Sequence, residues 1–156
     1  MTRFQLIGLP HTPFEPLFLL ADRQLAEIGA RRVIAGAHSG YPCRISLADA
    51  QLGDELLLLP FEHQPANSPY RASGPIYVRR GVQQQTLAPD EITDYVATRL
   101  ISVRAYDAQH MMVAAEVCEG TDAGDLISQH FDHAGVAYIH LHNARQGCFS
   151  CLARRA

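Results

Sequence analysis

Apolar residues recur along this chain in short groups whose spacing changes between the strand period and the helix period. Alternating or continuous apolar runs of about four to eight residues are typical of β-strands. Within one such run, Leu56 to Leu59 is apolar at every position, which indicates burial on both faces and an interior place in a sheet. In the first half of the chain the pattern predicts strands at residues 4–9, 31–35, 55–61 and 75–79.

Helical spacing appears in the stretches between these strands. Thr12 is a candidate N-cap with Glu15 three residues later, and the apolar positions that follow keep helical spacing until Gly29. This combination predicts a helix. Similar capping and spacing signals recur further along the chain, one of them long enough for a single helical turn only. The predicted helices span residues 12–29, 46–51, 89–100 and 121–135.

A predicted hairpin joins residues 101–107 to residues 111–118 through a turn at Ala108 and Gln109. With the strands near the C-terminus, the count reaches about eight strands and three or four short helices in mixed order. We therefore expect an α+β fold with a mixed, largely antiparallel sheet. The length of 156 residues fits one globular domain over residues 1–156.

The strand predicted over residues 136–142, with the sequence VAYIHLH, concentrates histidines on one side. Because alternate residues of a strand share a face, His140 and His142 project together with Tyr138. The apolar residues between them project to the other side, toward the core. This face is the first candidate for a functional site.

A hairpin loop over residues 143–147 would join this strand to a final one. In that register His142 lies opposite Cys148 and His140 lies opposite Ser150, so that two imidazoles, a thiol and a hydroxyl share one patch. The same register turns two residues of the final strand toward the core, namely Phe149 and Cys151.

Composition excludes several classes of protein. The formal net charge of −3 argues against a nucleic-acid or anionic-membrane surface. No apolar run approaches a membrane span of roughly 18 residues, and the start of the chain lacks the apolar core of a signal peptide. We therefore expect a cytoplasmic monomer or homodimer with reduced cysteines. The chain contains no lysine, and all 13 basic side chains are arginine, so an anion site here would use planar guanidinium forks.

Arginine and histidine side chains gather at the predicted strand ends and loops. If they converge, they form a pocket suited to a small carboxylate or phosphate, because arginine binds either anion through two parallel hydrogen bonds. Binding of such an anion requires no cofactor. The alternative, in which each arginine pairs with an acid such as Glu62 or Asp107, stays open at this point. The predicted ligand-binding residues are His63, Arg71, Arg79, Arg104, His140, His142, Asn143 and Arg145.

Three alternatives accompany this hypothesis. In the first, His140 and His142 are ligands of a transition metal such as zinc, with Cys148 or His63 as the third ligand of a metal-dependent hydrolase. In the second, Cys148 is a catalytic nucleophile activated by His142, with Asn143 orienting the imidazole ring. In the third, the chain is a structural or protein-interaction domain without a small-molecule site.

Several of these residues belong to distinctive short motifs. The motifs are YPCR at 41–44, EHQP at 62–65, RASGPIYVR at 71–79, SVRAYDA at 102–108 and HLHNARQGC at 140–148. Together they resemble an uncharacterised bacterial family, the domain-of-unknown-function family twelve hundred and three, over nearly the whole chain. The resemblance implies no reaction, cofactor or catalytic residue. One departure is His110, which stands where a turn glycine is expected and argues against a tight turn there.

Overall fold

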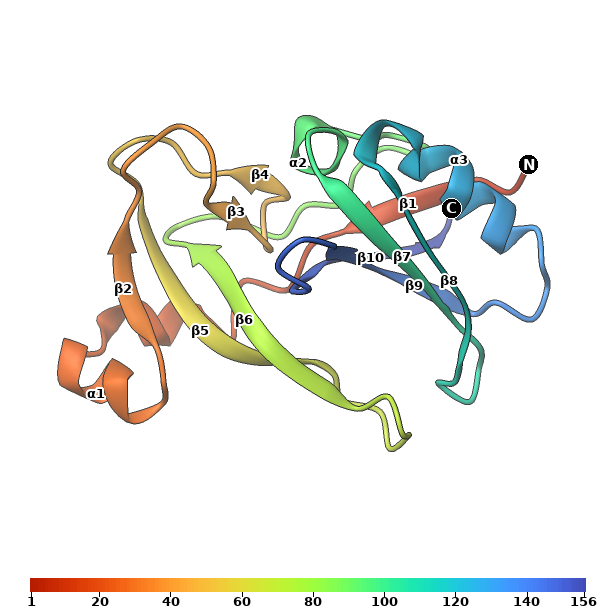
Figure 1. The fold of residues 1–156 in the computed structure, drawn as a ribbon. Coiled ribbons are helices and arrows are strands. Elements are labelled where there is room, and N and C mark those ends of the chain that lie inside the picture. The colour runs from red at the N-terminus through yellow and green to blue at the C-terminus, as the bar shows by residue number, and fades with distance from the viewer.

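Ten strands form two five-stranded sheets that lie side by side in the computed structural model, which describes residues 1–156 (Figure 1). The first sheet is antiparallel throughout and contains, in spatial order, β1 (Phe4–Ile7), β10 (Phe149–Arg155), β9 (Tyr138–Asn143), β7 (Leu100–Tyr106) and β8 (Met112–Glu119). The second sheet contains β2 (Arg31–Ile34), β5 (Glu55–Gln64), β6 (Ala72–Arg79), β3 (Pro42–Cys43) and β4 (Ala48–Asp49), and only the β3–β6 pairing is parallel.

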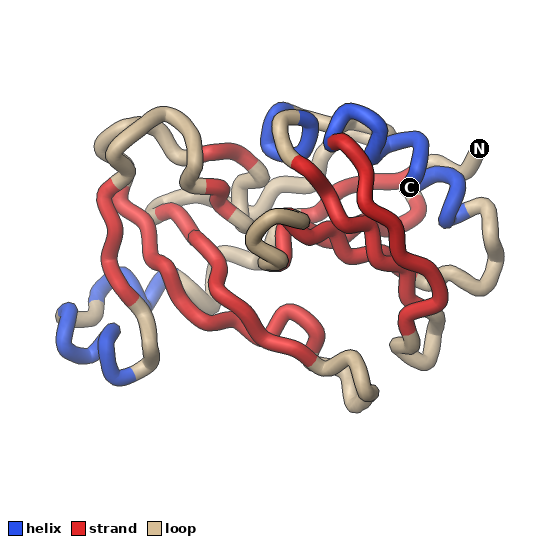
Figure 2. Tube along the Cα trace, in the orientation of Figure 1, coloured by secondary structure: helices blue, strands red, loops and turns tan.

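The helices are short and lie at the outer sides of the sheets (Figure 2). They are η1 (Glu15–Leu19), α1 (Asp22–Glu27), α2 (Asp94–Ala97), η2 (Gly120–Asp122) and α3 (Ala123–Phe131). None of them is long and apolar enough to cross a membrane. The α+β class with largely antiparallel pairing is confirmed, and the strands divide between two sheets.

Each sheet has a separate hydrophobic core. In the first sheet the core lies under α3 and includes Leu6, Ile101, Val103, Ile127, Phe131, Ile139, Leu141 and Cys151. In the second sheet it lies under η1 and α1 and includes Phe14, Phe18, Leu25, Leu57, Leu59, Ile76 and Val78. Because the core of the first sheet occupies only one of its faces, the face toward the second sheet is free to carry polar residues.

Residues 12–29 form two short helices where one long helix was predicted. Leu20 and Ala21 are extended, with ψ angles of 147° and 156°. Pro16 favours the first turn of η1 but supplies no backbone N–H. A second helix then begins, because the Gln24 side chain accepts a hydrogen bond from the Ala21 N–H at 2.9 Å and so caps α1.

The other helix predictions also need correction. Helix α2 is shorter than residues 89–100, because Asp90 has a φ of 65° and its carboxylate binds Arg3 and the Phe4 N–H of β1. These contacts hold the segment before Asp94 outside the helix. Residues 46–51 contain β4 and not a helical turn, and Leu47 within them has a φ of 53°.

The loop between β9 and β10 begins one residue later than predicted, after Asn143 instead of after His142. Asn143 donates its N–H to the carbonyl of Cys148 at 2.9 Å, and Gly147 donates to the carbonyl of Asn143 at 2.7 Å. Phe149, and not Cys148, therefore lies opposite His142. A shift of one residue in register moves side chains to the other face of a sheet.

A β-bulge then restores part of the predicted arrangement. The pairing is irregular between Phe149 and Cys151, so that Ser150 is the extra residue and Cys151 lies opposite Leu141. The prediction that Cys151 belongs to the core is confirmed, since it is 1% exposed and packs in the first core. The prediction for Phe149 is wrong, because its ring contacts the histidines.

Candidate functional site

The polar face of the first sheet looks toward the second sheet and is built from three rows of cross-strand partners. Ser102 of β7 lies opposite His142, Arg104 lies opposite His140, and Tyr106 lies opposite Tyr138. We call this surface the histidine face and define it as Ser102, Arg104, Tyr106, Tyr138, His140, His142 and Phe149. The prediction that Tyr138, His140 and His142 share one side of the strand is confirmed by this pairing.

The second sheet adds residues from the end of β5 and from the loop after it. His63 stacks on Phe149 with ring centroids 5.5 Å apart, and its ring centroid lies 5.0 Å from that of His142. Gln64 donates a hydrogen bond from Nε2 to the Tyr138 hydroxyl at 2.9 Å. Tyr70 meets Tyr106 edge to face at 6.0 Å. Three imidazoles from two sheets thus converge at one place.

The imidazoles are held in their neutral form. Burial lowers the pKa of His140 to about 3, with His142, His63 and the Arg104 guanidinium adding to the effect. Burial likewise lowers the pKa of His142 to about 4, although its bond to the Gly147 carbonyl works in the opposite direction. Burial and then Arg104 also lower the pKa of His63. At pH 7 these histidines therefore carry no charge.

Three ring nitrogens in this cluster have no partner. The Nδ1 of His142 lies 2.9 Å from the Gly147 carbonyl oxygen, and since a carbonyl only accepts, Nδ1 holds the proton and Nε2 presents a lone pair. That Nε2 and the Nδ1 atoms of His63 and His140 are buried without a hydrogen bond. Buried polar atoms usually find partners, so these nitrogens mark unused binding capacity.

Arg104 supplies the positive charge of the site. Its Nε donates to the Ser102 hydroxyl at 3.1 Å, no hydrogen bond leaves its two terminal nitrogens, and none of the nine ion pairs of the chain includes it. Its guanidinium lies close enough to lower the pKa of His63, His140 and His142. The fork is therefore free to bind an acceptor from outside the chain.

The other three predicted arginines lie elsewhere. Arg71 pairs with Glu62 at 3.1 Å, and Arg79 pairs with Asp54 at 3.0 Å. Arg145 is exposed in the hairpin loop. For Arg71 and Arg79 the structure thus shows the pairing with acids that the sequence left open, and of the four arginines it brings only Arg104 to the histidines.

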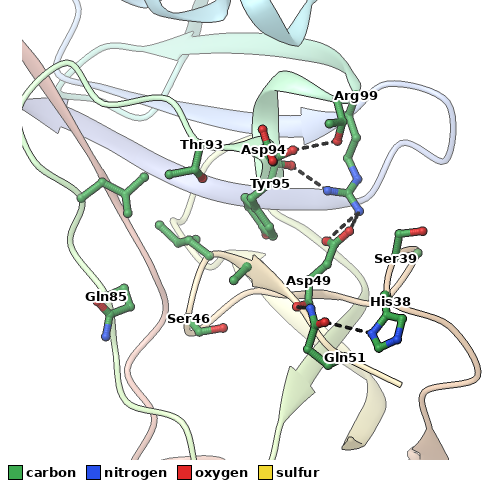
Figure 3. A pocket seen from close by; sticks show the side chains of 15 residues that line it. His38, Ser39, Ser46, Asp49, Gln51, Gln85, Thr93, Asp94, Tyr95 and Arg99 are labelled. Carbon is green, nitrogen blue, oxygen red and sulfur yellow. Dashed lines mark hydrogen bonds and ion pairs between the residues drawn. The ribbon is translucent and has the colours of Figure 1, made fainter. Parts of the chain in front are cut away.

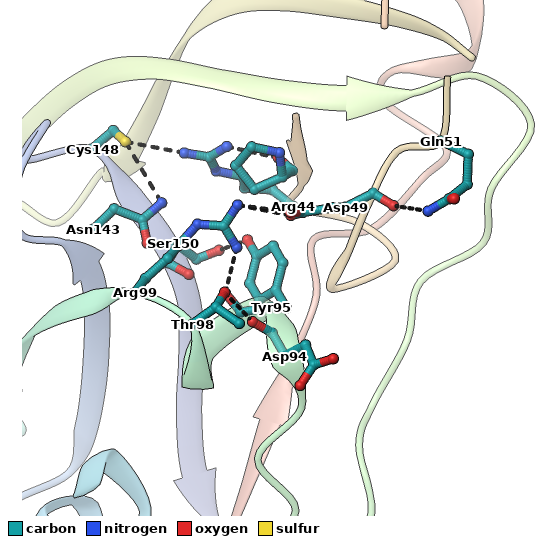
Figure 4. A network of polar contacts seen from close by, with 11 residues as sticks. Arg44, Asp49, Gln51, Asp94, Tyr95, Thr98, Arg99, Asn143, Cys148 and Ser150 are labelled. Atoms are coloured by element: carbon teal, nitrogen blue, oxygen red, sulfur yellow. Dashed lines mark hydrogen bonds and ion pairs between the residues drawn. The ribbon is translucent and has the colours of Figure 1, made fainter. Parts of the chain in front are cut away.

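Asn143 and Cys148 face a different neighbour from the one predicted. Cys148 receives a hydrogen bond from Arg44 Nη2, with 3.2 Å between nitrogen and sulfur, and Asn143 Nδ2 approaches the same sulfur at 3.9 Å (Figure 4). His142 instead binds the loop carbonyl of Gly147. No three histidine, cysteine, aspartate or glutamate side chains are arranged to hold a metal ion.

A cavity of about 500 Å³ opens beside the histidines, between the end of β5 and the strands β9 and β10. His110 reaches into this region and lies 2.8 Å from the Tyr138 hydroxyl through Nδ1. The lining residues are His63, Gln64, Pro65, Ala66, His110, Ala137, Tyr138, His140, Leu152 and Arg154.

A larger cavity of about 950 Å³ lies between the β3–β4 turn and α2 (Figure 3). Its strongest charges neutralise each other, because Arg99 Nη2 binds both carboxylate oxygens of Asp49 at 2.9 and 3.0 Å. None of the residues that the sequence predicts for the site lines this cavity. The one remaining charge in its lining is the exposed carboxylate of Asp94, so the cavity offers no free cation to an anionic ligand.

Sequence reasoning missed several residues of the site. Tyr106, Gln64 and Tyr70 come from segments far from the terminal hairpin. Gln64 and Tyr106 lie in the EHQP and SVRAYDA motifs, whereas no pattern in the sequence pointed to Tyr70. Arg44 is only 2% exposed and lies in the YPCR motif, so the motif was the one signal that pointed to it. Phe149 was placed on the wrong face by the one-residue difference in register.

Comparison with known proteins adds a family. Residues 40–155 match the family described as "Protein of unknown function (DUF1203)". The match covers most of the chain, though less of it than the motifs suggested. Searches of curated proteins and of solved structures find no match.

Proposed function

Because the chain belongs to the DUF1203 family, whose description names no activity, we propose from the chemistry of the histidine face alone that the protein binds a small anion there. The observation that supports this proposal is the free guanidinium fork of Arg104. A fork with no carboxylate partner matches the two oxygens of a carboxylate or phosphate through parallel hydrogen bonds.

The histidines contribute through their lone pairs and their capacity to take up protons. A neutral imidazole accepts a hydrogen bond from a protonated oxygen of the ligand, such as the hydroxyl of a hydrogen phosphate. An anion beside His140 or His142 also favours protonation of the ring. Binding should therefore be accompanied by proton uptake and should become tighter as the pH falls toward the pKa values of the two rings.

The surroundings also suit a small polar ligand. The adjacent cavity of about 500 Å³ falls in the size range of small-molecule sites. No acidic residue lines it, and the rings of Tyr106 and Tyr138 lie beside the imidazole of His140, with centroids 5.2 and 5.3 Å from its own. The region therefore combines two guanidinium groups without a carboxylate partner, Arg104 beside the histidines and the exposed Arg154 in the lining of the cavity, with neutral donors and acceptors.

The test is the thermal stability of the protein with phosphate, sulfate and acetate at constant ionic strength. At a concentration about a hundred times the Kd, a ligand adds about 2.7 kcal/mol to stability, or roughly 5–10 °C in Tm for a domain of this size. Arg104→Lys should weaken this response, since an ammonium does not reproduce the planar fork. Arg80→Lys, whose arginine pairs with Glu55 at 2.8 Å, is the matched control. An equal rise with sodium chloride, or an unchanged response in Arg104→Met, contradicts the proposal.

A zinc site is the second candidate, and one observation favours it. His142 donates Nδ1–H to a backbone carbonyl, which is the usual support of a metal-bound imidazole, and leaves Nε2 free as a ligand. The positive charge of Arg104 would repel a divalent cation bound at the same place. Metal analysis of protein purified without a histidine tag decides between zinc binding and anion binding. A stoichiometric zinc content that is lost in His142→Ala supports zinc, whereas less than a tenth of an equivalent ends this candidate.

A further inference from the structure

A third cavity, of about 250 Å³, lies at the junction of the two sheets and is lined in part by a thiol. Cys148 lies at its edge and is half-buried. Arg44, Asn143 and Arg99 line the cavity together with apolar parts of β5 and β6, and Figure 4 shows the polar side chains gathered around the sulfur. This cavity is separate from the one beside His63 and His140.

Arg44 gives the sulfur a positively charged neighbour. Its Nε donates to the Phe149 carbonyl at 2.8 Å, its Nη1 donates to the Pro42 carbonyl at 2.7 Å, and its Nη2 donates to Cys148 Sγ at 3.2 Å. No carboxylate pairs with this buried guanidinium. The nucleophilic form of a cysteine is the anion, and Arg44 is placed to donate a hydrogen bond to it.

Asn143 provides an independent sign of a missing polar partner. The residue is 4% exposed, lines the cavity and directs Nδ2 toward the sulfur, while its Oδ1 has no hydrogen-bond partner. A buried amide oxygen without a donor is costly. A small molecule with an O–H group in this cavity would satisfy that oxygen beside the sulfur.

The remaining cysteines lack these features. Cys43 and Cys151 are fully buried, and burial raises the pKa of Cys151 to about 12. Cys118 on β8 is half-buried like Cys148, but burial and three neighbouring carboxylates raise its pKa. Cys148 is therefore the one thiol that combines access with a positive neighbour, and Cys118 is its natural internal control.

We propose that Cys148 is a nucleophilic thiol that reacts with small hydroperoxides admitted to the cavity at the sheet junction. The sulfur attacks the distal peroxide oxygen, an S–O bond forms, and the O–O bond breaks with its electron pair passing to the departing oxygen. That oxygen takes a proton from solvent and leaves as water or an alcohol. The sulfur is oxidised to a sulfenic acid and the peroxide is reduced. Arg44 and Asn143 donate hydrogen bonds to the charge that moves between sulfur and oxygen.

The test treats the whole protein with hydrogen peroxide in the presence of dimedone, which traps sulfenic acids, and quantifies each cysteine peptide by mass spectrometry. Cys148 should be labelled about tenfold faster than Cys118 or more, because their exposure is similar and their charged neighbours differ in sign. In Asn143→Ala the rate at Cys148 should fall several-fold while the rate at Cys118 stays the same.

Two further variants complete the design. Arg44→Met should reduce labelling of Cys148 most, and if it does not fold, Asn143→Ala still decides the question. Arg31→Met, which removes an exposed arginine of β2, controls for net charge and should change neither rate. Equal labelling of Cys148 and Cys118, or an unchanged rate at Cys148 in Asn143→Ala, overturns the proposal.

Discussion

His140 and His142 are only 6% and 1% exposed, yet neither ring is paired with an acid. Their neutrality is a consequence of burial together with the positive charge of Arg104. The cost of charging them is therefore part of the stability of the protein. At the scale of single residues, this makes the histidine face sensitive to pH.

We expect the free energy of unfolding to fall between pH 7 and pH 4. The pKa of each ring is lower in the folded state than its usual value near 6.5, so below that value the unfolded chain binds more protons and is favoured. The stability that the neutral rings contribute is complete above about pH 6.5 and is lost as the pH falls toward their folded pKa values. Urea unfolding at pH 7, 5.5 and 4.5 measures the loss, on the order of a few kcal/mol.

The control is the variant His140→Gln, which lacks the titrating ring. Its stability should depend less steeply on pH than that of the wild type, whereas His133→Gln, which alters an exposed histidine, should leave the slope unchanged. If stability depended equally steeply on pH in the wild type and in His140→Gln, the pH dependence could not be assigned to His140.

His110 adopts the left-handed backbone conformation of a tight turn, although a glycine is expected at this position. It has a φ of 63°, and the turn is closed by hydrogen bonds between Asp107 and Met111. The left-handed conformation costs a non-glycine residue about 1–2 kcal/mol. The contact between His110 and the Tyr138 hydroxyl offsets part of that cost.

We therefore expect His110→Gly to be more stable than His110→Ala by about 1 kcal/mol, because both lose the contact with Tyr138 and only glycine relieves the backbone strain. Thermal unfolding of the two variants at neutral pH is the measurement. An alanine variant as stable as the glycine variant would show that the conformation of this turn costs little.

At the scale of elements, the β9–β10 hairpin determines which side chains face the site. The alternation along β9 correctly predicts the faces of His140 and His142, because it depends only on the geometry of one strand. The partner of His142 depends on loop length, and a loop over residues 143–147 and the observed one differ by a single residue. Loop length and the bulge at Ser150 are selected by packing around the hairpin, which no local pattern records.

Gly147→Ala should destabilise the protein by about 1 kcal/mol. Gly147 has a φ of 81° with no atom near the position of an added Cβ, so the loss comes from backbone strain alone. Gly135→Ala is the control, since that glycine also has open space around it but no positive φ. Chemical denaturation of both variants should separate them, and equal stabilities would mean that the loop adapts.

At the scale of the whole molecule, buried polar links join two sheets that have separate cores. Arg44 binds the carbonyl of Phe149 in β10, and Gln64 of β5 donates to the Tyr138 hydroxyl of β9 at 2.9 Å. Gly8, after β1, lies against the carbonyl of Ile45, after β3. The two sheets therefore depend on a few close contacts between backbone segments.

Gly8→Ala should destabilise the molecule by about 3 kcal/mol or more, because the added Cβ would overlap the Ile45 carbonyl and the backbone there has little freedom to move. Gly74→Ala in β6, where a Cβ meets no atom, should change stability little. The midpoints of thermal unfolding give both values. A small effect of Gly8→Ala would mean that the junction between the sheets is adaptable.

The sequence by itself determined the α+β class, the interior place of the Leu56–Leu59 strand and the shared face of His140 and His142. These features follow from periodicity over a few residues, which the backbone geometry of a strand enforces. Only the tertiary structure decided that Arg71 and Arg79 pair with acids, that Arg104 stays free, and that Arg44 meets a sulfur 104 residues away. Such pairings depend on which distant segments pack together, and that choice is made by the whole chain at once.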